Sequence, residues 1–123
     1  MARTYKDLVA WQKAMELVTE VYRITQHFPK EEMYGLTAQV RRAVVSVPSN
    51  IAEGQARYSH MDFQRFLRQA RGSLVEVETQ VMIGVNLGFL DGKDAKPILG
   101  RTAEVGRILN ALLNSIRERT AEN

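Results

Sequence analysis

The chain contains two histidines, His27 and His60, and no cysteine, so imidazole chemistry rests on two positions. A di-iron site in a helical bundle needs Glu-x-x-His pairs on facing helices. The residues three positions before the histidines are Ile24 and Arg57, so neither histidine forms such a pair. Arg23 precedes His27 by four positions, and Arg57 precedes His60 by three. Both spacings differ from the arginine–histidine motif of the HEPN family of helical ribonucleases.

Other catalytic patterns are missing from the sequence as well. Neither glycine-rich nucleotide motif, G-x-G-x-x-G or G-x-x-x-x-G-K-[ST], occurs. Glu76 and Glu78 are two positions apart, so on a helix they lie on different faces and cannot work as paired carboxylates. Ser49 and Asn50, beside Pro48, either line a pocket or support a distorted helix with hydrogen bonds. Without a nucleophile–base pair or a metal cluster, we predict a protein that is not an enzyme and uses no metal or cofactor.

The remaining candidate for a functional site is a cluster of arginines in residues 36–71. This segment holds six arginines and two acidic residues, a charge of +4, whereas residues 1–35 sum to zero and residues 72–123 to −1. A local positive surface suits a phosphate backbone, because each neutralised phosphate releases counterions. Solvent-exposed arginines without a ligand would give the same charge count, so this second interpretation also stays open. The candidate nucleic-acid-binding residues are Arg41, Arg42, Arg57, Arg65, Arg68 and Arg71.

Length and composition indicate one domain over residues 1–123. The absence of cysteine excludes disulfides and thiolate chemistry and fits a reducing compartment. The first residues, MARTYKDLVAW, lack an apolar leader, and no run of 18 apolar residues occurs. We therefore expect a cytoplasmic protein that does not cross a membrane.

Apolar residues recur at steps of three and four along most of the chain, which is the period of an amphipathic helix. Pro29 ends the first helix, because the residue before a proline avoids the helical region. Gly54 is expected to end the second helix as a left-handed residue. Asp91 or Asp94 caps the last helix. Four helices are predicted, at about residues 6–27, 32–53, 60–89 and 94–118.

Short connections between these helices require each to run antiparallel to the next. The predicted fold is therefore all-α, an up-down-up-down antiparallel four-helix bundle. Pro48 lies inside the second helix and is expected to kink it. Gly72, Gly84 and Gly88 are interpreted as close-packing positions on the third helix.

The apolar surface of the predicted helices exceeds what one bundle can cover. Residues 74–90 are apolar nearly all round, and a helix that is apolar on every side is buried on every side. The second helix carries a further arc of small apolar residues away from its main face. We therefore predict a ring-like homo-oligomer whose subunits meet at Val45, Val75, Met82 and Ile83.

Three segments resemble the bacterial four-helix-bundle proteins encoded by intervening sequences in 23S ribosomal RNA genes. They are LVAWQKAMEL at 8–17, FPKEEMYGLTAQVRRAVVSVPSNIAEG at 28–54 and FLRQARGSLVEVETQ at 66–80. The resemblance implies a four-helix bundle assembled as a ring, commonly a homopentamer. The chain is also similar to the accessory protein of diversity-generating retroelements, a basic pentameric barrel thought to engage nucleic acid and reverse transcriptase.

Two functions remain in view from the sequence. The first is a non-catalytic, oligomeric nucleic-acid-binding protein that holds RNA or DNA on a repeated basic surface. The alternative is a protein-interaction scaffold, or an accessory subunit for a nucleic-acid-processing partner. The expected partners are thus other copies of the chain, RNA or DNA, and a further protein.

Overall fold

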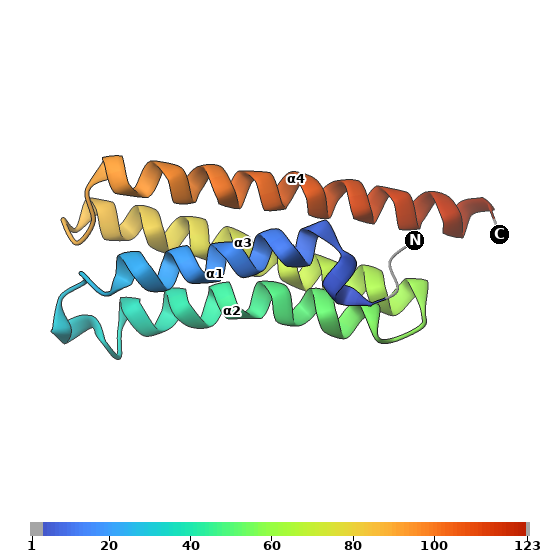
Figure 1. Ribbon diagram of the computed structural model, residues 1–123, viewed down its shortest axis with the longest axis horizontal. Coiled ribbons are helices and arrows are strands. Elements are labelled where there is room, and N and C mark those ends of the chain that lie inside the picture. The colour runs from blue at the N-terminus through green and yellow to red at the C-terminus, as the bar shows by residue number, and fades with distance from the viewer. Residues whose placement is uncertain (1–3, 123) are drawn as a thin grey trace.

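The computed structural model describes residues 4–122 of the chain, with side chains described through Arg119. This part of the chain forms four α-helices, two short 3₁₀ helices and no β-strand. Consecutive helices run in opposite directions (Figure 1), which confirms the predicted all-α bundle. The elements are η1 Tyr5–Asp7, α1 Val9–Thr25, η2 Lys30–Glu32, α2 Leu36–Gln55, α3 His60–Asn86 and α4 Gly92–Glu122.

Each α-helix packs against its neighbours in the chain, and α1 closes the bundle against α4. Within the described range, no Cα atom of α1 lies within 8 Å of one in α3, and none of α2 lies within 8 Å of one in α4. All four helices contribute aliphatic side chains to one core, as their apolar stripes predict. No helix among the described residues combines the length and the apolarity that crossing a bilayer requires. The bulkiest fully buried side chains are Leu17, Ile51, Leu67, Ile98, Leu109 and Ile116.

The first helix begins later than the sequence indicates because a capping box forms before it. Thr4 Oγ1 accepts a hydrogen bond from Lys6 N at 3.1 Å, and Asp7 Oδ2 accepts one from Thr4 N at 3.2 Å. These bonds close the 3₁₀ turn η1, so α1 starts at Val9 rather than at residue 6. Likewise, η2 precedes α2 and moves the start of that helix from residue 32 to Leu36.

Gly54 does not terminate α2, contrary to the sequence prediction. The helix continues to Gln55, and Gly54 lies inside it without a positive φ. A Cβ atom at this position would stand 2.7 Å from the Cβ of Phe66. The glycine therefore serves the close approach of α2 and α3 rather than a turn.

Gly88 is the left-handed glycine of the bundle, with a φ of 79°. Its N–H donates to Val85 O at 3.0 Å and the Phe89 N–H donates to Gly84 O at 2.9 Å, which is a Schellman motif. It ends α3 at Asn86, not at residue 89. Of the three glycines predicted to pack closely, only Gly84 does so. A Cβ atom at Gly84 would stand 3.1 Å from Cζ of Phe28, whereas one at Gly72 or Gly88 would face open space.

Asp91, not Asp94, caps the last helix. Its Oδ1 accepts a hydrogen bond from Lys93 N at 3.1 Å, so α4 begins at Gly92 rather than at residue 94. Pro97 consequently lies in the second turn of α4, where it lacks the N–H that would bond to the Lys93 carbonyl.

Pro48 is accommodated within an unbroken α2. Hydroxyl and amide groups around it bond back to the helix: Ser46 Oγ donates to Ala43 O at 2.8 Å and Ser49 Oγ donates to Val45 O at 2.9 Å. Asn50 Nδ2 donates to Ser46 O, also at 2.8 Å. The polar residues beside the proline therefore support the helix backbone, which favours the structural interpretation of Ser49 and Asn50 over a pocket.

Candidate nucleic-acid interface

The six arginines singled out in the sequence lie on different surfaces of the bundle. Arg41 faces α1, and Arg42 borders an open depression between α2 and α3. Arg57 lies in the connection between these two helices, and Arg65 lies near the start of α3. The last pair, Arg68 and Arg71, lies in the groove between α3 and α4. The local charge excess of the sequence is therefore divided among several sites.

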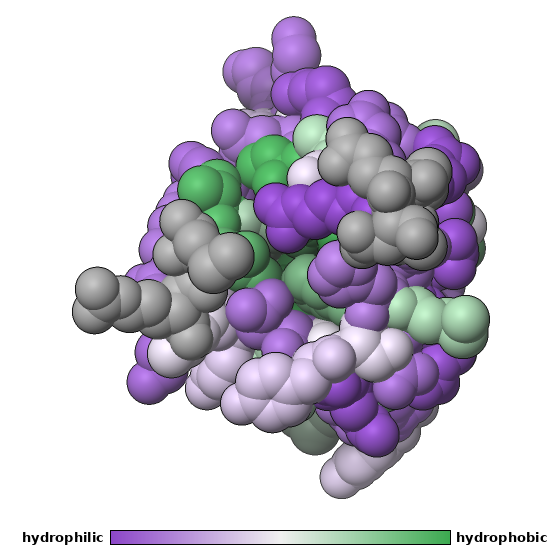
Figure 2. Space-filling model, turned by 90° about the vertical axis from the view of Figure 1, so that its right-hand side faces the viewer, coloured by the Kyte–Doolittle hydropathy of each residue, from purple (hydrophilic) through white to green (hydrophobic). Residues whose placement is uncertain are grey.

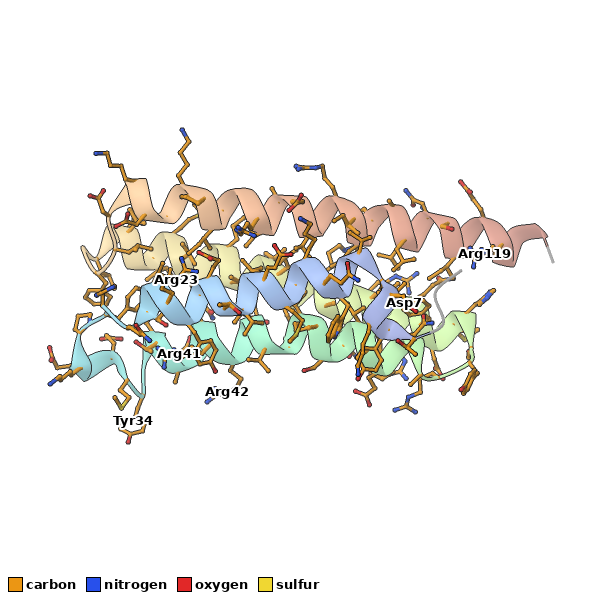
Figure 3. All side chains as sticks on the ribbon, viewed as in Figure 1. Asp7, Arg23, Tyr34, Arg41, Arg42 and Arg119 are labelled. Carbon is orange, nitrogen blue, oxygen red and sulfur yellow. The ribbon has the colours of Figure 1, made fainter. Side chains whose placement is uncertain are left out.

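Arg41 is bound within the bundle. Its Nε donates to Thr25 Oγ1 at 2.8 Å, and its guanidinium carbon lies 4.5 Å from the centroid of the Tyr22 ring. Figure 3 shows Arg41 at the junction of α1 and α2, whereas the neighbouring Arg42 points away from the bundle. Arg41 thus joins two helices, and Arg42 is exposed.

Arg57 and Arg65 both lie over the ring of Phe66. Their guanidinium carbons are 5.2 Å and 4.6 Å from the ring centroid. Each also forms an ion pair with a carboxylate near in the sequence, Arg57 with Glu53 at 3.1 Å and Arg65 with Asp62 at 3.4 Å. These two arginines are held in place, with about half of each side chain exposed to solvent.

The groove between α3 and α4 brings three arginines together, in a depression of about 300 Å³. Two of them, Arg68 and Arg71, were singled out in the sequence, and the third is Arg117 from α4. The antiparallel register of the two helices places Arg117 opposite the first turns of α3. The other residues that line the groove are Gln64, Asn110, Leu113 and Asn114.

Each groove arginine is oriented by a neutral amide oxygen. Arg71 Nη1 donates to Asn110 Oδ1 at 2.9 Å. The Nη2 of Arg68 donates to the Gln64 amide oxygen at 3.1 Å, and the Nη2 of Arg117 donates to that of Asn114 at 2.6 Å. An amide oxygen fixes the direction of a guanidinium group but carries no net charge to neutralise it.

No carboxylate among the described residues lines the groove, so the positive charge of its arginines is not compensated by a lining residue. Among the described side chains, ion pairs form at Arg23, Arg57, Arg65 and Arg101. None of the three groove arginines has such a pair there. Several cations in a concave site raise the local potential and attract anions. The groove can therefore hold phosphate or carboxylate groups, and its guanidinium groups can bind them through two parallel hydrogen bonds.

Sequence reasoning missed Arg117 because the residue lies outside the basic segment 36–71. The signal that could have found it is the antiparallel pairing of the last two helices, in which the end of α4 lies beside the start of α3. The side chains described here contain no cluster of three or more His, Asp or Glu residues that could hold a metal ion.

The four residues predicted at subunit interfaces are all exposed in the single chain. Val75 and Met82 are 58% and 50% exposed, and both lie on the outer surface of α3 with Ile83. Val45 lies on a different surface, in the depression between α1 and α2 that Val18 and Tyr22 also line.

Comparison with known proteins places the chain among helical bundles. Its fold is similar to that in the crystal structure of a protein of unknown function, from the S23 ribosomal protein family, of Bacteroides thetaiotaomicron VPI-5482. The TM-score is 0.77 at 18% sequence identity, over 85% of this chain and 98% of that chain. Functionally curated proteins give no match to the chain. The family model for the 23S rRNA-intervening sequence protein matches residues 6–111, and the chain therefore belongs to this family.

Proposed function

We propose that this protein is a non-catalytic nucleic-acid-binding protein that holds the phosphate backbone of RNA or DNA in the α3–α4 groove. The observation that carries the proposal is the set of three arginines, Arg68, Arg71 and Arg117, in a groove whose described lining contains no carboxylate. Phosphate contacts position a nucleic acid but carry little sequence information. We therefore expect binding that depends strongly on salt and weakly on sequence.

The composition of the groove favours binding over catalysis. Its polar lining consists of guanidinium and carboxamide groups. A guanidinium stays protonated at physiological pH, and a carboxamide does not exchange protons readily, so neither serves as a general acid or base. Both are good hydrogen-bonding partners for phosphate and sugar oxygens.

We further propose that copies of the chain associate into a ring through their exposed apolar side chains, with five copies as the family resemblance implies. The supporting feature is that these side chains occupy two different surfaces: Val75, Met82 and Ile83 on α3, and Val45 between α1 and α2. Contact between two unlike surfaces is head-to-tail and closes into a ring when the rotation allows. A ring would repeat the groove and convert a weak contact into avidity.

The alternative role is a scaffold or an accessory subunit for a nucleic-acid-processing protein. The same exposed apolar stripe on α3 supports it, since a second protein could cover that stripe in place of another copy. Proteins that remain bound in a pull-down after nuclease treatment would favour this role, whereas recovery of nucleic acid alone would count against it.

Fluorescence anisotropy with labelled RNA and DNA, titrated with salt, tests the nucleic-acid-binding proposal. The decisive variant replaces Arg68, Arg71 and Arg117 with Gln and is expected to lower the slope of log affinity against log salt by about 3. A matched control replaces Lys13, Arg23 and Lys93 with Gln, which removes the same charge outside the groove. Equal losses in both variants, or no binding by the unmodified protein at low salt, would refute the groove as the site.

A further inference from the structure

The connection between α2 and α3 presents a tyrosine whose side chain has no role in the core. The ring of Tyr58 is fully exposed, with a relative accessibility of 101%. Its backbone has a φ of 50°, and no other non-glycine residue in the described part of the chain has a positive φ. A bulky residue in the left-handed region costs free energy that glycine or asparagine would largely avoid. Folding alone therefore does not account for a tyrosine at this position.

The backbone on both sides of Tyr58 is fixed by hydrogen bonds. On one side, Arg57 N donates to Gly54 O at 3.2 Å. On the other, Ser59 Oγ accepts from Asp62 N at 3.3 Å and caps α3. The ring is thus presented to solvent from a short, tethered connection. Strained backbone that its surroundings hold in place is found most often at functional sites.

Two arginines beside this connection, each paired with a carboxylate, lead along α3 to the arginines of the α3–α4 groove. Arg57 is the neighbour of Tyr58, and its guanidinium group, like that of Arg65, lies over Phe66. Arg68 and Arg71 then follow Arg65 at steps of three residues along α3. The six residue steps from Arg65 to Arg71 span about 9 Å along the helix axis. Figure 2 shows the end of the bundle that carries this connection, where hydrophilic residues predominate around a small apolar area.

We propose that the Tyr58 ring is a stacking platform for a nucleobase, so that the nucleic acid held by this protein is single-stranded. This inference rests on the proposed nucleic-acid-binding function. Aromatic side chains beside a cationic track bind single strands by stacking on the bases, which any base sequence allows. In a duplex the bases are already stacked on one another and are not available to the ring. The arginines hold the phosphates, and Tyr58 distinguishes a free strand from a duplex.

The test compares a labelled oligothymidine with an abasic strand of the same length, which carries the same phosphates but no bases. We expect the unmodified protein to bind the oligothymidine about tenfold more tightly, as stacking on one aromatic ring provides. The variant Tyr58→Ala should lose this preference and keep its affinity for the abasic strand. Tyr58→Phe and Tyr58→Trp should retain the preference, because each keeps an aromatic face.

Tyr34 supplies the matched control, because its ring is 92% exposed and it projects from the opposite end of the bundle (Figure 3). Tyr34→Ala should keep the preference for bases. The variant Tyr58→Gly, which relieves the positive φ, should show an unchanged circular dichroism spectrum and the same loss of preference as Tyr58→Ala. This second variant separates a failure of stacking from a failure of folding.

The outcomes distinguish the inference from the function on which it rests. Equal, salt-dependent binding of both strands by the unmodified protein would overturn stacking and leave phosphate binding intact. Retention of the preference by Tyr58→Ala, or its equal loss in Tyr34→Ala, would also overturn the role of Tyr58. Binding of neither strand would overturn both proposals. A duplex of the same length that binds as tightly as the single strand would contradict single-strand selection.

Discussion

The guanidinium group of Arg71 on α3 donates to Asn110 on α4, from Nη1 to Oδ1 at 2.9 Å. This bond joins residues 39 positions apart and orients a cation without neutralising it. Asn110→Asp would keep the size of the side chain and add a negative charge next to Arg71. We expect this variant to lower the slope of log affinity for RNA against log salt by about 1. Its free energy of unfolding should rise by about 0.3–1 kcal/mol, since a neutral bond becomes an ion pair.

Asn86→Asp is the matched control for this prediction. Asn86 is exposed at the end of α3, away from the groove lining, and the substitution changes the charge of the chain by the same amount. Equal effects of the two substitutions on RNA binding would show that net charge, and not the groove, determines affinity.

Arg41 and Arg42 are neighbours in the sequence with different expected roles. Because Arg41 donates to Thr25 and lies over Tyr22, Arg41→Gln should lower the free energy of unfolding by about 1–2 kcal/mol. Arg42 is exposed, so Arg42→Gln should change it by less than about 0.5 kcal/mol. Urea denaturation of the two variants measures both values. Equal free energies of unfolding for the two variants would contradict the stabilising contact that Arg41 makes between α1 and α2.

Replacement of two glycines in neighbouring helices by alanine should change the stability of the fold in opposite directions. A Cβ atom on Gly54 would stand 2.7 Å from Phe66, so Gly54→Ala should force α2 and α3 apart and destabilise the fold by about 1–3 kcal/mol. Gly72 faces open space inside α3, and Gly72→Ala should stabilise the fold by about 0.5–1 kcal/mol. Thermal unfolding followed by circular dichroism reports both. A stabilising Gly54→Ala would show that the helices are less closely packed.

Self-association is testable at Met82, whose side chain is exposed on α3. Met82→Glu should place a charge in the proposed contact between subunits and yield smaller species by light scattering. Met33→Glu is the control, because Met33 is also exposed but lies in the connection between α1 and α2. If the unmodified protein already has the mass of one 14.0 kDa chain at micromolar concentration, the ring proposal fails.

The apolar pattern of the sequence predicts the four helices and their main buried faces. Val40, Val44 and Val47 recur at helical spacing, and all three are buried as that spacing requires. The ends of helices were harder to predict, because they depend on contacts that spacing does not encode. Gly54 and Gly88 look alike in the sequence. Their roles differ because Phe66 packs closely on Gly54, whereas Gly88 adopts a left-handed backbone after α3.

The candidate site was only partly predictable for a related reason. Arg68 and Arg71 belong to the basic segment and could be singled out by charge alone. Arg117 joins them through the register of α3 and α4, which the sequence leaves undetermined. Arg41 has the same charge as its neighbours, but its bond to Thr25 depends on how two helices pack. Charge is a property of the residue, whereas its availability to a ligand is a property of the fold.

The way in which each helix packs on the next has a consequence for how the chain folds. Three of the four helix–helix seams join elements that are consecutive in the chain, and only the seam between α1 and α4 joins its two ends. Mostly local contacts give a low contact order, and helical bundles of this kind fold within microseconds to milliseconds. We therefore expect single-exponential refolding of the single chain in stopped-flow experiments at concentrations too low for association. Docking of α4 on α1 is the step that requires the largest loop closure.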